Sequence, residues 1–356
     1  LYACYTYPTY KYDDLAPPPE TQSLHAELLE RLLAEAARRD VAKAPGTFTT
    51  KKIGAESYVY FQYSEPGGKT KQLYIGKKGA STDKLIHRFQ KERISETATR
   101  ADIERLSAQV LAGGAWSMGH APARVLKAFA DAGLFETGAV LIGTHAFGLM
   151  GNLLGARWKG SHLQTQDLDS AAMALVAVVN ESSVDAPGAL ERLEMGFLPV
   201  PGLDSRRPST SFKVRGGSLR VDFLTPGRGE KPVELGRLGT YAHPLPYLDF
   251  LIENPERAVI LDAGGFLTLI PSPARFALHK LIIAHERLAS EHAKTEKDLS
   301  QATEVISFLA QARPGDLRLA ADALRRRKWM KKLTRVWGQA LKRHPELAPA
   351  GERIGF

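Results

Sequence analysis

The sequence predicts a mixed α/β (α+β) protein whose central mixed β-sheet is flanked by an N-terminal hairpin-and-helix unit and a C-terminal helical domain. Tyrosine-rich strand patterns border a turn between 58 and 75, apolar strand-like runs alternate with helical segments between about 134 and 271, and apolar residues recur at helical spacing from 273 onward. We therefore expect four parts: an irregular arm at 1–22, a helix, β-hairpin and helix unit at 23–133, a central domain at 134–272 and a helical domain at 273–356.

Composition and charge limit the class of protein. The chain has 356 residues, 44% of them hydrophobic and 24% charged, which is ordinary for a globular protein with a sizeable core. Its formal net charge of +9 favours a polyanionic partner, either a nucleic acid or a phosphate-bearing substrate. The single cysteine, Cys4, excludes an internal disulfide framework. No apolar run approaches the roughly 18 residues of a membrane span and no signal peptide is visible, so we expect a cytoplasmic protein.

The N-terminal unit alternates between helix and hairpin signals. Leucines at helical spacing predict a helix over 23–39, and strand patterns at 58–63 and 71–75 flank a Pro-Gly-Gly turn. Further helices are expected over about 82–111 and 122–132. Because lysines surround the tyrosines of the hairpin, it either stacks on RNA and neutralises it or is a solvated basic surface that covers the next domain.

The central region alternates strands and helices. An apolar run at 138–142 predicts a buried strand that reaches a Gly-Thr turn, and a helix is expected at 144–154. An Arg-Gly-Gly turn suited to positive φ joins strands at 209–214 and 218–224. The other expected elements are a polar loop at 157–164, a strand at 165–171, a helix at 186–195 and strands at 247–252, 258–261 and 266–270 that complete the mixed sheet.

A pair of carboxylates on one predicted strand points to a metal. Side chains alternate along a strand, so Asp167 and Asp169 face the same side while Leu168 turns into the core. Two like charges side by side repel each other unless a cation or a proton lies between them. A hard divalent metal suits this position, because it takes carboxylate oxygens and completes its shell with water and phosphate.

A third carboxylate lies on the strand at 218–224. Leu219, Val221 and Phe223 form its apolar face, so Arg220 and Asp222 stand on the opposite face.

These features resemble the nucleotidyltransferase superfamily typified by DNA polymerase β. Its signature is an apolar residue before Gly with Gly or Ser, a D-x-D strand, and one more acidic residue on an adjoining strand; here Thr144 replaces the Gly or Ser and keeps a hydroxyl. More closely, the chain is similar to bacterial nucleotidyltransferase-like proteins, distant relatives of the abortive-infection toxin nucleotidyltransferases. The resemblance spans about 134–288, and its matching segments are 141–147, 165–169, 219–226 and 271–281.

The resemblance implies a metal-dependent enzyme that moves an NMP from an NTP to an acceptor hydroxyl or phosphate and releases pyrophosphate. Its catalytic residues and ligands of Mg²⁺ or Mn²⁺ would be Asp167, Asp169 and Asp222. Its nucleotide-binding residues would be Gly143, Thr144, Thr165, Arg220 and Lys280.

Each nucleotide-binding role has a physical basis. Gly143 lets the backbone approach the phosphates without a Cβ, and the Thr144 hydroxyl and the first amides of the following helix would bind phosphate oxygens. Arg220 would help to neutralise charge on the face that it shares with Asp222. Lys280 resembles the lysine that such families place on the phosphates, and the alternative for it is a surface ion pair.

Several other polar residues have two interpretations. His145 is either catalytic or packed in the first turn of its helix, and packing is the favoured alternative. His279 and His285 flank Lys280 without a third ligand at a fixed spacing, which argues against a zinc site. In the predicted loop, Arg157, Lys159 and His162 either gate nucleotide entry or belong to a surface loop.

The C-terminal region is predicted to be helical at 273–288, at 296–312 and over a basic segment at 316–343. The basic segment would hold RNA through its phosphates, lie on an anionic membrane surface, or pack its apolar residues on the core with its charges in water. Its apolar residues are Trp329, Leu333, Val336 and Trp337.

The favoured function is therefore a nucleotidyltransferase with an NTP as substrate and RNA, tRNA included, as acceptor; a protein side chain and a small molecule are the other acceptors. A toxin role is compatible with the resemblance. The competing functions are a non-catalytic nucleic-acid-binding protein that keeps the fold as a scaffold, and a nuclease or phosphodiesterase that uses the same acidic residues. The sequence does not indicate an oligomeric state.

Overall fold

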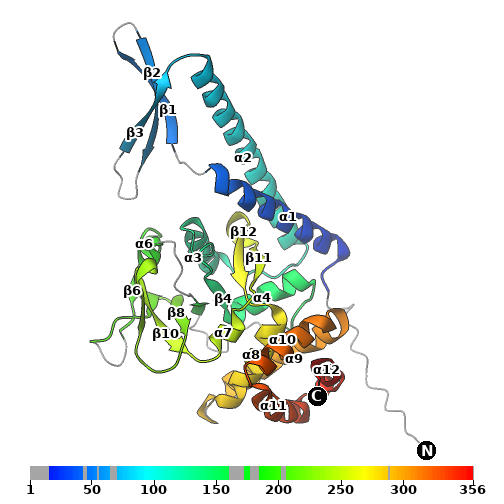
Figure 1. Ribbon diagram of the computed structural model, residues 1–356. Helices are drawn as coiled ribbons and strands as arrows, with labels where there is room; N and C mark the ends of the chain where they lie inside the picture. The colour runs from blue at the N-terminus through cyan, green and yellow to red at the C-terminus, as the bar shows by residue number, and fades with distance from the viewer. Residues whose placement is uncertain are drawn as a thin grey trace, which may run out of the picture.

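The computed structural model describes residues 16–42, 46–53, 56–64, 70–159, 172–176, 184–201, 206–287 and 289–355. Figure 1 shows a mixed α/β core, a group of helices that contains the C-terminus, and a helical arm that ends in a small sheet. The predicted fold class is confirmed, because the described residues include a sheet with both parallel and antiparallel pairs, N-terminal strands and C-terminal helices.

The arm contains two helices and one sheet. Helix α1 (Pro19–Ala42) leads into strands β1 (Gly46–Ile53), β2 (Glu56–Ser64) and β3 (Thr70–Lys77), and the long helix α2 (Ala80–Ala112) follows. The three strands are antiparallel in the order β1-β2-β3. The predicted hairpin is thus confirmed as β2 and β3, with β1 as a third strand. Figure 1 shows this sheet at the end of α2 that lies farther from the core.

A small hydrophobic cluster attaches the arm to the core. Leu28 and Leu32 of α1 are buried against α2 and against strand β11 (Glu256–Ile260), which belongs to the central region. The cluster consists of Leu28, Leu32, Ile103, Leu106, Val110, Val259 and Leu261. Because burial of each such side chain contributes about 1.5–3 kcal/mol, the contact fixes α1 and the C-terminal part of α2 to the core.

The central sheet has the strand order β4-β5-β8-β10-β9, with β7 also paired to β8 and β6 to β7. Strand β4 is antiparallel to β5, whereas β5, β8 and β10 are parallel to one another. The core strands and helices are α3 (His120–Asp131), β4 (Val140–Ile142), α4 (Gly143–Leu154), β5 (Ala172–Val176), α6 (Ala186–Glu191), β6 (Phe197–Pro199), β7 (Ser211–Val214), β8 (Arg220–Pro226), β9 (Val233–Leu235), β10 (Thr240–Leu245), α7 (Leu248–Leu251), β11 and β12 (Phe266–Ile270).

The predicted strand at 247–252 is wrong, because this segment forms the short helix α7. Tyr247 has a left-handed backbone with φ 67° and turns the chain there. Leu248 and Leu251, three residues apart on the helix, are both buried, so the apolar run packs on one side as a helical turn does. The predicted strands at 258–261 and 266–270 exist as β11 and β12, but among the described strands they pair only with each other.

The C-terminal helices share the hydrophobic core of the central sheet. Phe147 of α4 stacks on Phe276 of α8 with ring centroids 6.1 Å apart, and one cluster of buried side chains extends from the sheet into these helices. The helices are α8 (Pro273–Glu286), α9 (His292–Ala312), α10 (Pro314–Arg326), α11 (Met330–Arg343) and α12 (Ala348–Ile354). Lys328 separates α10 from α11 with a φ of 60°. Across the part of the chain that is described, none of the helices combines the length and apolar character needed to cross a membrane.

Candidate active site

The turn between β4 and α4 is built for close backbone approach. Strand β4 ends at Ile142 and α4 begins at once with Gly143, whose φ of +78° lies in the left-handed region that favours glycine. Among the described residues, no atom lies within 4 Å of where a Cβ at Gly143 would be, so they leave the space above the turn open. No side chain caps the helix. Its first amides, which have no partner inside the helix, therefore face a site suited to an anion.

Two tryptophans fix α4 in place. The Trp116 ring lies so close to Gly148 that a Cβ there would come within 2.5 Å of it. On the same helix, Gly151 approaches the Trp158 indole, and a Cβ would lie 2.9 Å from its Nε1. The Asn152 side chain accepts from the Trp116 amide at 2.8 Å and donates to the Trp116 carbonyl at 2.9 Å. Small residues thus let α4 pack tightly, which holds the Gly143 turn rigid.

Strand β8 presents Asp222 on its solvent-facing side. Val221 and Phe223 are buried, whereas Arg220 and Asp222 are half-buried, as the alternation predicts. Asp222 Oδ1 accepts hydrogen bonds from Ser211 Oγ at 2.5 Å and from Arg220 Nε at 2.7 Å. Within the residues that the structure describes, Asp222 Oδ2 receives no hydrogen bond. The carboxylate is 25% exposed and so has one oxygen available to a ligand.

The register of the sheet brings the turn and the carboxylate to the same edge. Ala174 of β5 pairs with Ile142 of β4 on one side and with Asp222 of β8 on the other. Gly143 follows Ile142 directly, so Gly143 and Asp222 flank the N-terminal half of β5, on strands about 10 Å apart. The predicted residues Thr165, Asp167 and Asp169 lie outside the described residues, and β5 begins three positions after Asp169 in the sequence.

Lys280 is engaged in a buried ion pair. Its Nζ contacts Asp298 Oδ1, and Arg287 Nε donates to Asp298 Oδ2 at 2.8 Å. The Lys280 and Asp298 side chains are only 12% and 4% exposed. Of the two alternatives for Lys280, the structure therefore contains an ion pair, and it is buried between α8 and α9 instead of lying on the surface.

Two histidines are held neutral. Burial lowers the pKa of His145 to about 4, with a smaller contribution from the positive charge of Lys297, and its ring lies edge-on to Trp116 at 6.4 Å. Burial lowers the pKa of His279 to about 3, and the charge of Lys280 adds to this. His145 is thus packed in the first turn of α4. Within the described residues, no group of three or more His, Cys, Asp or Glu side chains is arranged to hold a metal ion.

The loop after α4 is described only at its start. Arg157 is exposed and donates to the Gly113 carbonyl at 3.5 Å, and the Lys159 amide donates to Glu304 Oε2 at 3.2 Å. His162 lies outside the described residues. These contacts hold the beginning of the loop against α9 and the end of α2.

The basic C-terminal helices pack their apolar residues on the core. Leu333, Val336 and Trp337 are buried, and the Trp329 ring lies edge-on to Tyr247 at 4.9 Å. Several cations pair with acids, as in the 2.7 Å contact of Arg327 with Glu253. Other cations are exposed and have no acidic partner among the described residues: Arg326, Lys328, Lys331, Arg335 and Lys342. Packing on the core and a basic outer surface therefore coexist.

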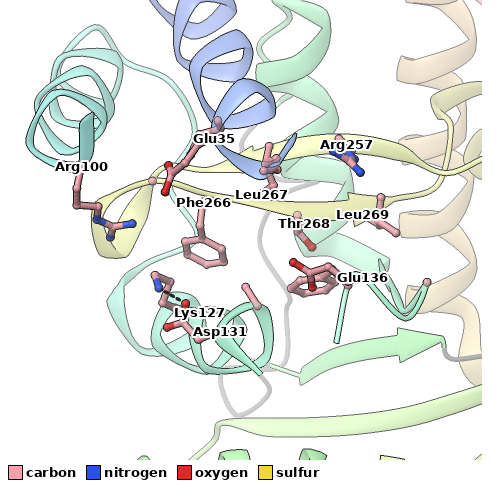
Figure 2. Close-up of a pocket in the computed structure, with 16 residues that line it drawn as sticks. Glu35, Arg100, Lys127, Asp131, Glu136, Arg257, Phe266, Leu267, Thr268 and Leu269 are labelled. Atoms are coloured by element: carbon pink, nitrogen blue, oxygen red, sulfur yellow. Dashed lines mark hydrogen bonds and ion pairs between the residues drawn. The ribbon is translucent and has the colours of Figure 1, made fainter. Parts of the chain in front are cut away.

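A cavity that the sequence did not reveal lies at the junction of the arm and the core. It has a volume of about 490 Å³ and is lined by α1, α2, α3, β11 and β12. Figure 2 shows Phe266 among its lining side chains and Lys127 paired with Asp131. Its charged residues are Glu35, Asp131, Glu136, Arg100, Lys127 and Arg257. Because acids and bases balance, this cavity does not favour a triphosphate, unlike the open turn at Gly143.

A match to a known protein family includes most of the residues described above. A family model described as nucleotidyltransferase matches residues 120–325, more than half of the chain. The matched range contains the Gly143-Thr144 turn, Asp167, Asp169 and Asp222. No curated protein and no solved structure matches the chain. The edge of the sheet and the family match lead to one conclusion: the chain belongs to the nucleotidyltransferase family and is a nucleotidyltransferase.

Proposed function

We propose that the protein moves an NMP from an NTP to an acceptor hydroxyl or phosphate at the sheet edge beside Gly143 and Asp222. The register of β5 carries this proposal, since Ala174 pairs with both neighbouring strands at that edge. The D-x-D pair ends at Asp169, three positions before β5 in the sequence. Three residues of chain span at most about 11 Å, which supports a role for this pair near the N-terminal end of β5.

Different groups of the chain bind different parts of the nucleotide or support the site. The amides at the start of α4 and the Thr144 hydroxyl hold phosphate oxygens, which the open space above Gly143 admits. Arg220 balances negative charge next to Asp222, and its guanidinium also donates to Ser211 Oγ at 3.0 Å. Thr165 contributes a hydroxyl from the segment before β5. Lys280 acts at a distance from the phosphates, by keeping α8 on α9 through Asp298.

The donor set fits a hard divalent cation. Asp222 has an oxygen without a hydrogen bond from the described residues, and Asp167 and Asp169 supply further carboxylate oxygens. Oxygen-only donors of this kind select Mg²⁺ or Mn²⁺ over softer metals. When bound there, such a cation would neutralise phosphate charge and lower the pKa of the acceptor hydroxyl.

RNA, with tRNA as one form of it, is the acceptor that the charge favours. The net charge of +9 attracts a polyanion, and the C-terminal cations that have no acidic partner among the described residues offer phosphate contacts.

Transfer of label from each α-labelled NTP tests the function. The protein is incubated with Mg²⁺ or Mn²⁺ and total RNA, and the wild type is compared with Asp167→Ala/Asp169→Ala. We expect the wild type to label RNA and the double variant to lose this activity. Asp131→Ala is a matched control, because it removes an exposed aspartate of α3 that pairs with Lys127. Label transfer that persists in the double variant, or no transfer by the wild type to RNA, protein or small acceptors, would refute the proposal.

A further inference from the structure

The sheet of the arm carries a row of tyrosines on one face. In the antiparallel register, Tyr60 of β2 lies opposite Tyr74 of β3, and Tyr58 is two positions along the same strand face. The ring of Tyr74 lies 5.5 Å from that of Tyr60 and 6.2 Å from that of Tyr58. Tyr74 is 54% exposed, which is unusual for so large an aromatic side chain.

The two faces of this sheet differ. Val59, which lies between the tyrosines and points to the opposite side, is completely buried. On β3, Gly76 approaches Thr82 of α2, and a Cβ there would lie 3.5 Å from the threonine methyl group. The opposite face is thus covered by the start of α2 around Val59 and stays exposed along β1, whereas Tyr74 on the tyrosine face is open to solvent.

Positive charge and amide groups accompany the tyrosines. Lys51 pairs with Tyr58 in the register, and its ammonium lies 5.2 Å from the centre of the Tyr60 ring. It also donates to Gln72 Oε1 at 2.5 Å, and Gln72 donates to Gln62 at 2.9 Å. Glu56, an acid on this face, is neutralised by Lys77 at 2.7 Å. From 46 to 79 the sequence contains six lysines and two glutamates, so the sheet is basic as a whole.

We propose that the tyrosine face, defined as Tyr58, Tyr60, Tyr74, Gln62, Gln72 and Lys51, binds a single-stranded segment of RNA. Bases stack on the tyrosine rings, lysines contact the phosphates, and the glutamine amides reach base edges. A duplex fits this face poorly, because its bases are already stacked and expose only their edges. A membrane fits it poorly as well, because the phenolic and amide groups would lose hydrogen bonds in hydrocarbon.

The inference rests on the proposed function in one respect, namely that the bound RNA is the acceptor. Helix α2 has 33 residues and is therefore about 50 Å long. Its C-terminal end is tied to the core, where Trp116 meets Asn152 of α4. The arm thus holds the body of a long acceptor while the acceptor end reaches the sheet edge, and a short oligonucleotide does not bridge the two sites.

Fluorescence polarisation of a labelled, unstructured 12-nucleotide RNA tests the binding. The full chain is used in EDTA without any NTP, so that catalysis does not contribute. We expect Tyr74→Ala to weaken binding about 5- to 150-fold, the range for loss of one stacked base, and Tyr74→Phe to retain it. Heparin, a polyanion without bases, should bind Tyr74→Ala and the wild type equally.

Two neighbouring lysines provide a matched control. Lys51 pairs with Tyr58 on the tyrosine face, whereas Lys52 pairs with Ser57 on the opposite face, and both are exposed. Lys51→Gln should therefore weaken RNA binding more than Lys52→Gln, although each removes one positive charge. Equal effects of the two lysine variants, or unchanged binding by Tyr74→Ala, would overturn the proposal and leave only a diffuse electrostatic surface. Thermal melting checks that all variants fold.

Competition separates the nucleic-acid sources and the two proposals. Single-stranded DNA of the same sequence shares the bases and phosphates, so a preference for RNA over this DNA assigns contacts to the 2′-hydroxyl. Duplex RNA should compete poorly, and duplex RNA that competes as well as the single strand would overturn the stacking model. RNA binding without any label transfer would refute the proposed function alone. Label transfer to another acceptor without RNA binding would refute this inference alone.

Discussion

Asp298 and Asp222 both make ion pairs with basic side chains, and the two pairs differ in how many carboxylate oxygens they use. Asp298 is 4% exposed and uses both oxygens, one on Lys280 and one on Arg287. Asp222 is 25% exposed and places Arg220 and Ser211 on the same oxygen. A buried, saturated carboxylate has no capacity for a ligand and serves to join helices. A half-buried carboxylate such as Asp222, whose Oδ2 receives no hydrogen bond from the described residues, can take a cation.

The largest expected effect is on catalysis, at the partly exposed pair of Asp222 and Arg220. Asp222→Asn keeps the shape of the side chain but removes its charge, so we expect kcat/KM for NMP transfer to fall about a thousandfold, or about 4 kcal/mol. Its stability should change by no more than about 1 kcal/mol, because the Arg220 pair is partly exposed. Steady-state kinetics and thermal melts measure both quantities. Normal activity with lowered stability would place Asp222 among the purely structural carboxylates.

A change in the buried ion pairs of Asp298 should lower stability and leave catalysis nearly unchanged. Asp298→Asn leaves the cations of Lys280 and Arg287 without their counter-charge between α8 and α9. We expect a loss of about 3 kcal/mol in the free energy of unfolding, with kcat of the remaining folded protein nearly unchanged. Urea unfolding gives the first quantity and active-site-normalised kinetics the second. If kcat falls with little loss of stability, Lys280 contacts the phosphates after all.

Acid should lower the free energy of unfolding through His279, which is buried in α8 next to Lys280. Because burial lowers the pKa of His279 from 6.5 to about 3, the unfolded chain binds a proton between these pH values and the folded chain does not. Its stabilising contribution is therefore complete above pH 6.5 and is lost as the pH falls, by about 2 kcal/mol at pH 5. Urea unfolding at pH 7.5 and 5 should show a smaller acid loss for His279→Gln than for the wild type. An equal loss in both proteins would assign the acid sensitivity to other groups.

The smallest expected effect concerns the turn at Gly143. The described residues leave room for the Cβ of Gly143→Ala, but φ is +78°, so we expect a destabilisation of about 1–2 kcal/mol. The matched control is Gly338→Ala in α11, where φ is not positive and the space is also open; alanine there should stabilise the helix slightly. Circular dichroism melts compare the two. Equal stability of both variants would show that the turn tolerates an ordinary residue.

Local patterns were sufficient for part of this fold. The alternation in 219–224 placed Arg220 and Asp222 on one face, and the apolar run before Gly143 predicted β4 and α4. Both depend on neighbours in sequence, where the side-chain period decides the structure. Strands β9 and β10 were not predicted: β9 has only three residues, two of them exposed, so it has no apolar pattern of its own and is defined by its pairing with the neighbouring strand β10.

The contacts of the site depend on distant parts of the chain and were not predictable. That Ala174 pairs with both Ile142 and Asp222 follows from strand register, which no single segment specifies. The partner of Lys280, Asp298, lies on another helix, and only the packing of α8 on α9 brings the two side chains together. The cavity of Figure 2 has lining residues from Leu32 to Leu269, so its charge balance emerges only after folding. The roles of Asp167 and Asp169 stay predictions.

Trp116 occupies the joint between the arm and the helix that begins at Gly143. Through Asn152 and Gly148 it is fixed to α4, while α2 ends only four residues earlier. Ile103, Leu106 and Val110 also fix the C-terminal part of α2 to the core, so a load on the distant tyrosines would reach Trp116 and the start of α4 through packed side chains. A small tilt of α2 would move the distant sheet much farther than it moves this indole. In a variant whose other three tryptophans are replaced, the emission of Trp116 would report such a movement.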